Sequence, residues 1–320
     1  MAHYDVFNGD ADGLCALHQL RLADPRESTL VTGVKRDIAL LARVPAVAGD
    51  TVTVLDVSLA RNREALQTLL ARGVRVNYFD HHYAGEPIAH PGLRCYIDLA
   101  PGVCTSVLVD RYLGGAQRRW AVVGAYGDNL AATAESLAGG LSPDQRQALR
   151  ALGEALNYNA YGETEADLLL PPARLYEALR PYADPFDFLA HAPVAQALMA
   201  RQREDMALAQ AAASKRDLPG GTVVQLPDTP WARRVQGVFA NALAREAPRR
   251  AHAVLCAVGP EAFTLSVRAP LRQPRAADAL CRQFPSGGGR TAAAGIDRLP
   301  RAQADAFVRA FDATYPAEVS

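Results

Sequence analysis

Acidic and imidazole side chains follow short apolar segments at several places in this chain. Asp80-His81-His82 comes directly after the apolar residues 74–79, and Asp56 ends a β-branched run. Short apolar runs of this kind are typical of buried strands in a parallel sheet. Ligands bind outside the carboxyl ends of the strands in an open parallel sheet. We therefore expect these side chains to face a single site.

Two further aspartates lie near the amino terminus. Asp10 and Asp12 follow a short apolar segment, residues 3–7, and are flanked by Gly9 and Gly13. The glycines permit a sharp turn from strand to helix. Carboxylates packed this closely repel one another unless a cation neutralises them. Considered alone, the segment is explained equally well as a surface turn capped by aspartate.

A further acid, Asp128, follows the apolar residues 120–126, which we interpret as another buried element that ends at the same sheet edge. Five side chains are then expected to converge as metal ligands: Asp10, Asp12, Asp56, His81 and Asp128. Mixed carboxylate and imidazole donors suit two Mn²⁺ or Mg²⁺ ions rather than a thiolate zinc site. Two such ions can clamp an in-line displacement at phosphorus. Taken singly, Asp56 is more simply a helix cap.

Other residues are suited to phosphate binding. Thr105 and Ser106 open a predicted helix whose amides can face a phosphate, although simple capping is as good an explanation. In the second half of the chain, Arg268 lies on a predicted strand. A glycine-rich loop supplies exposed amides beside a guanidinium, which also suits a phosphate. Its residues are Gly287, Gly288, Gly289 and Arg290.

Composition narrows the class of protein. The chain has 320 residues, with 49% hydrophobic and 21% charged residues, which predicts an ordinary globular protein with room for two domains. Lys plus Arg and Asp plus Glu both number 34, so bulk charge does not favour coating of long duplex nucleic acid. Five scattered cysteines argue against a disulfide framework or a zinc finger. The first residues do not resemble a signal peptide, and no apolar run is long enough for a membrane span. We therefore predict a cytoplasmic protein without membrane contact.

The alternation of apolar runs and helical patterns predicts an α/β protein. Residues 141–218 are rich in Ala and Leu at helical spacing, and we expect several helices there, the last of them over residues 194–215. A second, smaller α/β domain is expected to follow. Its predicted elements are a strand at 222–226, a helix at 231–246, a hairpin of strands at 251–258 and 263–268, and helices at 274–284 and 300–315.

In combination and order, these motifs resemble the DHH phosphoesterase superfamily, specifically the members that carry a DHH-associated C-terminal domain. The residues that carry the resemblance are Asn8-Gly9-Asp10-Ala11-Asp12-Gly13, Asp56, Asp80-His81-His82, Tyr126-Gly127-Asp128, Gly287-Gly288-Gly289-Arg290 and Ala293-Ala294-Gly295. The resemblance implies a parallel-sheet DHH domain at residues 1–190, a helical connector at 191–218 and a substrate-binding domain at 219–320. It places the active site in the cleft between the two domains.

The resemblance also implies roles for the metal ligands. Asp10 would bind one metal and Asp12 the other, with Asp56 bridging them, while His81 and Asp128 would complete the second site. The family often has histidine in its first motif. This chain has Asn8 there, whose carbonyl oxygen is a weaker ligand than imidazole, so that metal would bind loosely or use an extra water.

For the substrate, the resemblance implies that His82 faces the phosphate and that Asp80 orients a ligand. The far end of the substrate would be held by Arg268 and by the glycine-rich loop. That loop usually ends in histidine in the family, and Arg290 stands there in this chain. Arginine is always charged and binds phosphate in a bidentate manner, which favours a terminal phosphate or an acidic substrate.

The sequence-based hypothesis is a phosphodiesterase that uses two divalent ions, Mn²⁺ before Mg²⁺, to hydrolyse a dinucleotide or short oligonucleotide to 5′-mononucleotides. The family that the chain resembles includes nanoRNases, single-strand exonucleases, cyclic-dinucleotide phosphodiesterases and bisphosphate phosphatases. Two alternatives stay open: a phosphatase of a small phosphate monoester or nucleotide, and a catalytically weak nucleotide-binding regulator. No protein partner is implied, although a homodimer is compatible with the sequence.

Overall fold

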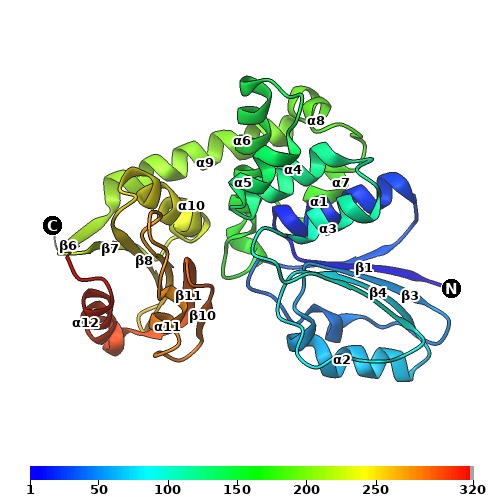
Figure 1. Ribbon diagram of the computed structural model, residues 1–320, viewed down its shortest axis with the longest axis horizontal. Helices are drawn as coiled ribbons and strands as arrows, with labels where there is room; N and C mark the ends of the chain where they lie inside the picture. Colours follow the sequence, from blue (N-terminus) through cyan, green and yellow to red (C-terminus); the bar gives the residue numbers. More distant parts are fainter. Residues whose placement is uncertain (318–320) are drawn as a thin grey trace. The chain divides into compact units, whose positions relative to one another are not determined.

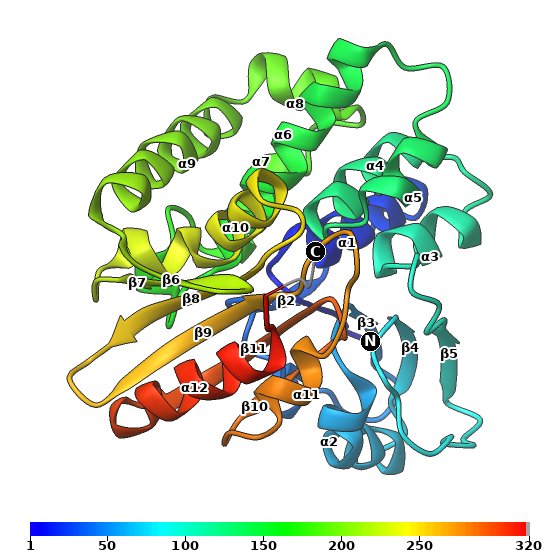
Figure 2. The ribbon, with the colours of Figure 1, turned by 60° about the vertical axis from the view of Figure 1, so that its left-hand side comes forward.

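The computed structural model describes residues 1–317 of the chain, so the last three residues of the predicted 219–320 domain lie outside the described residues. The fold divides into two compact units, Met1–Ala200 and Arg201–Ser320, which we call unit 1 and unit 2. Each unit has its own sheet and its own helices (Figures 1 and 2). The division falls within helix α9, Pro193–Ala212.

Unit 1 is built on a five-stranded sheet in the order β2-β1-β3-β4-β5. Every pair of neighbouring strands is parallel, which confirms the expected parallel sheet. The strands are β1 His3–Phe7, β2 Thr29–Val31, β3 Thr51–Leu55, β4 Arg75–Asp80 and β5 Leu93–Ile97. The shortest strand is β2, and β5 was not among the strands expected from the sequence.

The three central strands end at the same level. Phe7 pairs with Leu55, and Leu55 pairs in turn with Phe79. The residues that follow these positions therefore leave the sheet side by side at one edge. Parallel register thus explains why Asn8, Asp56 and Asp80 approach each other although they are far apart in the sequence.

Helices cover both faces of this sheet. One face packs on α2 and a short 3₁₀ helix through a core that includes Val54, Leu66 and Tyr78. The other face packs on α1 and the helices of the middle of the chain, through a core that includes Trp120. The helices are α1 Ala11–Ala23, α2 Leu59–Ala71, α3 Thr105–Tyr112, α4 Arg118–Gly127, α5 Ala131–Leu137, α6 Pro143–Ala160, α7 Pro172–Leu179 and α8 Pro185–His191, with 3₁₀ helices at Leu40–Arg43 and Glu165–Asp167.

The apolar residues 120–126 form helix α4 and not a strand, so Asp128 does not follow a strand of the sheet. Their run is apolar on all sides because α4 is packed between other helices. Glycines make that packing possible. A Cβ at Gly127 would lie 2.3 Å from Ala11 Cβ, and one at Gly153 would lie 2.3 Å from Val123 O. The close crossing of α4 with α1 brings Asp128 next to the start of α1.

Unit 2 is a six-stranded mixed sheet in the order β10-β11-β9-β8-β7-β6. Only β7 and β8 pair in parallel among these strands. The expected hairpin of β8 and β9 is confirmed. The elements are β6 Ser214–Leu218, β7 Gly221–Leu226, α10 Pro230–Glu246, β8 Ala251–Val258, β9 Ala262–Arg268, α11 Ala277–Cys281, β10 Gly287–Gly289, β11 Ala293–Pro300, a 3₁₀ helix Arg301–Gln303 and α12 Ala304–Thr314.

Three expectations for the second half of the chain were wrong. The last helix of the middle segment ends at Ala212, and the residues that follow it form strand β6. The glycine-rich segment is not a loop, because Gly287–Gly289 forms strand β10 at the edge of the sheet and pairs with β11. The small residues after Arg290 were not expected to form a strand, but strand β11 begins at Ala293.

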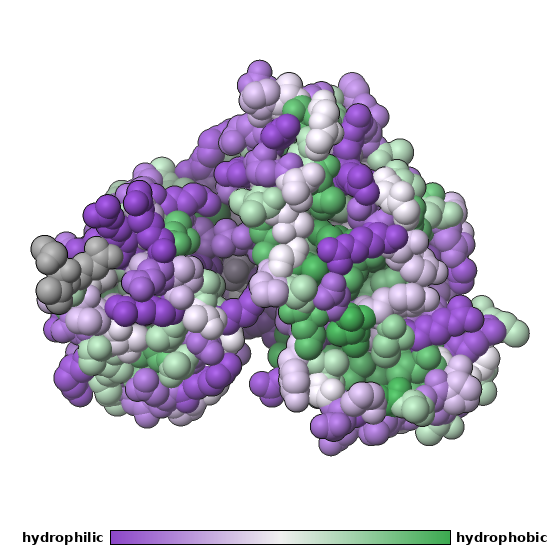
Figure 3. Space-filling model, viewed as in Figure 1, coloured by the Kyte–Doolittle hydropathy of each residue, from purple (hydrophilic) through white to green (hydrophobic). Residues whose placement is uncertain are grey.

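The surface of unit 1 carries several exposed large hydrophobic side chains, including Tyr83, Leu99 and Tyr112. In the view of Figure 3, hydrophobic residues gather over the middle of unit 1 and hydrophilic residues surround them. Within residues 1–317, no helix is both long and apolar enough to cross a membrane.

Candidate metal centre

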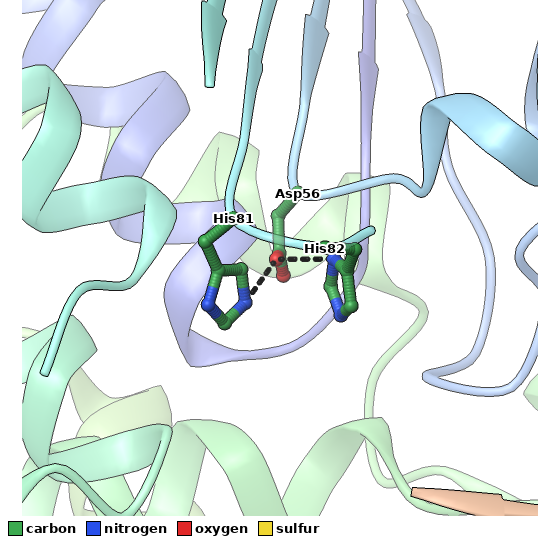
Figure 4. Close-up of side chains that lie close together, drawn as sticks. All are labelled: Asp56, His81 and His82. Atoms are coloured by element: carbon green, nitrogen blue, oxygen red, sulfur yellow. Dashed lines mark ion pairs between the residues drawn. The ribbon is translucent and has the colours of Figure 1, made fainter. Parts of the chain in front are cut away.

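The site at the sheet edge is centred on Asp56, His81 and His82, whose potential ligand atoms all lie within 4.8 Å of one another (Figure 4). Asp56 follows β3 directly, and both histidines follow β4. The Asp56 backbone is left-handed, with φ of 58°, which aspartate tolerates better than most residues. Its amide donates to Phe79 O at 3.0 Å. Strained backbone of this kind is common at functional sites.

The ring of His81 is oriented for metal binding. Its Nδ1–H donates to Val103 O at 2.9 Å, so Nε2 is the nitrogen that can bind a metal ion once its proton is displaced. Around Nε2 lie three carboxylate oxygens, from Asp56 at 3.3 Å, Asp12 at 3.9 Å and Asp128 at 4.0 Å. Ligands that are each about 2.1 Å from one ion lie about 3 Å or more apart. The distances from His81 Nε2 to these three oxygens are compatible with a shared divalent cation that binds oxygen and imidazole nitrogen.

The electrostatics of these groups also fit a cation. Burial, which disfavours the charged ring, is outweighed by the hydrogen bond and charge of Asp56, so the pKa of His81 rises to about 10. Burial and the charges of Asp10 and Asp12 raise the pKa of Asp56 well above its ordinary value. Protons thus compensate the surplus negative charge of the site, and a metal ion would replace them.

Asp12 has a second task in the fold. Its two carboxylate oxygens accept hydrogen bonds from the amides of Thr105 and Ser106, each at 2.7 Å. These amides belong to the first turn of α3, where unpaired N–H groups favour an anion. The structure thus shows the α3 amides bound to a carboxylate, and substrate binding by Thr105 and Ser106 stays a prediction. Thr105 Oγ1 also donates to Asp56 Oδ1 at 3.3 Å.

Asp80 holds the other histidine. Its Oδ1 accepts from His82 Nδ1–H at 2.7 Å and from the His81 amide at 2.9 Å. Asp80 is fully buried, whereas the His82 side chain is 45% exposed. The outward Nε2 of His82 is therefore the nitrogen that can meet a substrate. The orienting role of Asp80 in catalysis stays a prediction.

Asp10 has a partner that the sequence did not suggest. It caps α1, with Oδ1 accepting from the amides of Asp12 and Gly13, and its Oδ2 accepts from Lys35 Nζ. Burial would raise the pKa of Asp10, but Lys35 and the Gly13 amide lower it to about 2. Despite burial, the charge of Asp10 raises the pKa of Lys35. One signal could have indicated Lys35: it lies just after a strand of the same sheet.

The expected ligand Asn8 is 5% exposed and takes part in backbone hydrogen bonds. Its Oδ1 accepts from the Asp10 amide at 3.2 Å, and its Nδ2 donates to Lys35 O at 3.2 Å. Metal binding by Asn8 stays a prediction.

The expected phosphate-binding residues lie in unit 2. Arg268 Nε donates to Asn241 Oδ1 at 2.6 Å, and its Nη2 donates to Gly237 O at 3.5 Å, so this guanidinium is turned towards α10. Arg290 is exposed at the turn between β10 and β11, where its amide donates to Ala293 O at 2.8 Å. Substrate binding by Arg268, Arg290 and Gly287–Gly289 stays a prediction.

Solved structures share the arrangement of a parallel sheet followed by a mixed sheet. A DHH-domain member of the s1p family of ribosomal proteins matches with a TM-score of 0.63 and 14% identity, over 98% of this chain and 86% of that one. The exonuclease RecJ bound to manganese matches with a TM-score of 0.59 and 18% identity, over 98% and 89%. The pGpG-specific phosphodiesterase PggH from Vibrio cholerae matches with a TM-score of 0.56 and 15% identity, over 98% of both chains.

The chain therefore shares the fold of these structures, one of which is described as a DHH domain, and this confirms the predicted fold class. No protein-family model matches the sequence, and no curated protein matches it. Two of the similar structures, both of RecJ, were solved with manganese. At 14–18% identity the likeness is one of fold, and the site itself has to carry any statement about chemistry.

Proposed function

We propose that the chain is a metal-dependent phosphoesterase that hydrolyses a short nucleotide substrate, a dinucleotide or small oligonucleotide, to 5′-mononucleotides. The observation that carries the proposal is the surroundings of His81 Nε2, which faces three carboxylates while Nδ1 is held by Val103 O. When bound, a divalent ion in such a site activates water and stabilises the charge that develops on phosphate oxygens.

Different residues of the chain would bind the metal ion, contact the substrate and orient the contacting side chain. Asp12, Asp56, His81 and Asp128 would hold the ion. His82 has its Nδ1 committed to Asp80, so its exposed Nε2 is placed to donate a hydrogen bond or a proton to the phosphate or the leaving group. The buried carboxylate of Asp80 keeps the ring in that orientation and tautomer.

Two observations favour a nucleotide as the substrate. Tyr83 directly follows His82 and is 72% exposed, and an exposed aromatic ring near the reacting centre suits the stacking of a base. PggH is described as a phosphodiesterase specific for pGpG, and RecJ as an exonuclease. Both act on phosphodiester bonds between nucleotides.

A panel of substrates tests this proposal. Purified protein with Mn²⁺ is given 5′-phosphorylated dinucleotides, longer oligonucleotides and mononucleotides, and the products are separated by chromatography. We expect 5′-mononucleotides from the dinucleotides, at a higher kcat/KM than from the longer chains. His81→Ala should abolish the activity. Release of nothing from any dinucleotide or oligonucleotide would contradict the phosphodiesterase proposal.

The same panel separates the second candidate, a phosphatase of a small monoester or nucleotide, which Arg290 favours as a partner for a terminal phosphate. Inorganic phosphate would then be released from mononucleotides, and a second nucleotide would bring no gain in rate. A nucleotide-binding regulator would bind the dinucleotides but leave every substrate intact.

A further inference from the structure

Lys35 and Asp10 form a pair beside the candidate metal centre. Asp10 Oδ2, the oxygen that is not used in capping α1, accepts a hydrogen bond from Lys35 Nζ. The Asp10 side chain is 4% exposed and that of Lys35 is 28% exposed. An ammonium therefore lies against the carboxylate that was expected to bind one of two metal ions.

The position of Lys35 is fixed from several sides. Nζ also donates to Asn157 Oδ1 at 3.1 Å and lies 5.6 Å from the centre of the Tyr161 ring. The Lys35 amide donates to Ala160 O at 2.9 Å. These partners come from α6 and the residue after it, so the ammonium is held by the helical layer and by the sheet edge together.

The composition of the chain makes this lysine unusual. Of the 34 residues that are Lys or Arg, only Lys35 and Lys215 are lysines. A lysine carries a compact point charge, whereas the guanidinium of arginine is broad and planar. The compact ammonium of Lys35 contacts both the Asp10 carboxylate and the Asn157 amide oxygen.

Asn8 lacks the chemistry that would favour a metal here. An amide oxygen is a weaker ligand for transition metals than imidazole. Its Oδ1 already accepts from the Asp10 amide, and its Nδ2 donates to the backbone of Lys35. The side chain thus links the two members of the ion pair.

We propose that the centre holds one divalent ion, at Asp12, Asp56, His81 and Asp128, and that the ammonium of Lys35 takes the place of a second ion beside Asp10. This inference rests on the metal centre of the proposed function. Asp10 then serves to position Lys35 and not to bind metal. A fixed ammonium supplies positive charge towards a phosphate oxygen without a second ion.

The test counts the ions. The full chain is freed of metal with a chelator, dialysed against Mn²⁺, and analysed by mass spectrometry of the metal and by electron paramagnetic resonance. We expect one Mn²⁺ per chain with the spectrum of an isolated ion. Two ions per chain with an exchange-coupled spectrum would overturn the inference. No bound ion would contradict the proposed metal centre itself.

Variants show whether Lys35 is the reason that only one metal ion binds. Asn8→His alone should still bind one Mn²⁺, because the ammonium remains. Combining Asn8→His with Lys35→Met should raise the count to two, since Asp10 then has an imidazole neighbour and no cation. The control combines Asn8→His with Lys215→Met, which removes the other, exposed lysine and should bind one. If a folded Asn8→His/Lys35→Met protein still binds one ion, Lys35 does not replace a metal.

Discussion

At the scale of single residues, the most informative contact is that between Asp80 and His82. Asp80 Oδ1 accepts from His82 Nδ1–H, and its Oδ2 is buried with no hydrogen-bond partner among residues 1–317. Asp80→Asn removes the charge that orients the ring. We expect kcat to fall about 10- to 100-fold, the usual cost of losing a partner that orients a functional histidine.

The control for Asp80 is a double-mutant cycle. If Asp80 acts through His82, adding Asp80→Asn to His82→Ala should cause little further loss of kcat. Full additivity of the two losses would show that Asp80 acts independently of His82. Mn²⁺ affinity, measured by calorimetry, should change much less than kcat in both single variants.

A second prediction at this scale concerns His18, a buried residue of α1 outside the site. Its Nε2–H donates to Tyr182 O at 2.8 Å, and its ring packs edge-on against Trp120. Burial outweighs that carbonyl and lowers the pKa of His18 to about 4. An unfolded histidine has a pKa of about 6.5, so the unfolded state binds more protons between these values.

The contribution of neutral His18 to stability is therefore complete above about pH 6.5 and is lost as the pH falls towards 4, by about 3 kcal/mol. His18→Gln should unfold in urea with a smaller loss of stability over that pH range than the wild type. If the two proteins lose unfolding free energy in parallel from pH 7 to pH 4, His18 does not titrate as stated.

At the scale of elements, the close crossing of α1 and α4 decides where Asp128 lies. In Gly127→Ala, the new Cβ would lie 2.3 Å from Ala11 Cβ and 2.9 Å from Gly153 O. Helix propensity alone would favour alanine by about 1 kcal/mol. We expect the steric clash to outweigh this gain. The free energy of unfolding measured in urea should fall by about 1–3 kcal/mol, and Mn²⁺ should bind more weakly.

The control for this crossing is Gly139→Ala, because a Cβ at Gly139 has no neighbour within 4 Å. That variant should unfold like the wild type and bind Mn²⁺ equally well. A Gly127→Ala protein that is more stable than the wild type would show that α4 can shift away from α1 at no cost.

The same elements show what the sequence could and could not predict. The strands before Asp56 and Asp80 were predictable because β-branched and aromatic runs ended in polar residues. Helix α4 was not, since a helix buried on all sides shows no periodicity that separates it from a buried strand. Asp128 reaches the site by helix packing, a contact between distant segments that local patterns do not encode.

Lys35 was missed for a related reason. It follows the three-residue strand β2, whose pattern is too short to place its end, and its partner Asn157 lies on a helix more than a hundred residues away. Ion pairs between such distant segments depend on tertiary structure. The aspartates and histidines were found because each follows a longer apolar run.

At the scale of the whole molecule, the proposed metal ligands lie in unit 1 and the expected phosphate-binding arginines lie in unit 2. If unit 2 binds substrate only, its variants should leave the metal centre intact. Arg290→Ala should raise KM for a 5′-phosphorylated dinucleotide about tenfold, the loss of one charged hydrogen bond, with Mn²⁺ affinity unchanged.

The matched control is Arg272→Ala, another exposed arginine of unit 2. Its KM should stay at the wild-type value. Equal effects of Arg290→Ala and Arg272→Ala would mean that only the overall charge of unit 2 matters, and not a specific contact with the phosphate.

The central claim is that the carboxylates around His81 hold an ion that makes phosphoester hydrolysis possible. The direct measurement is the rate of dinucleotide hydrolysis by metal-free protein as Mn²⁺ is added, for the wild type and for Asp56→Asn. We predict no turnover without metal, saturation with Mn²⁺ in the wild type, and a loss of about 100-fold or more in Asp56→Asn. Equal hydrolysis with and without Mn²⁺, or Mn²⁺ binding with no turnover of any nucleotide, would contradict the account.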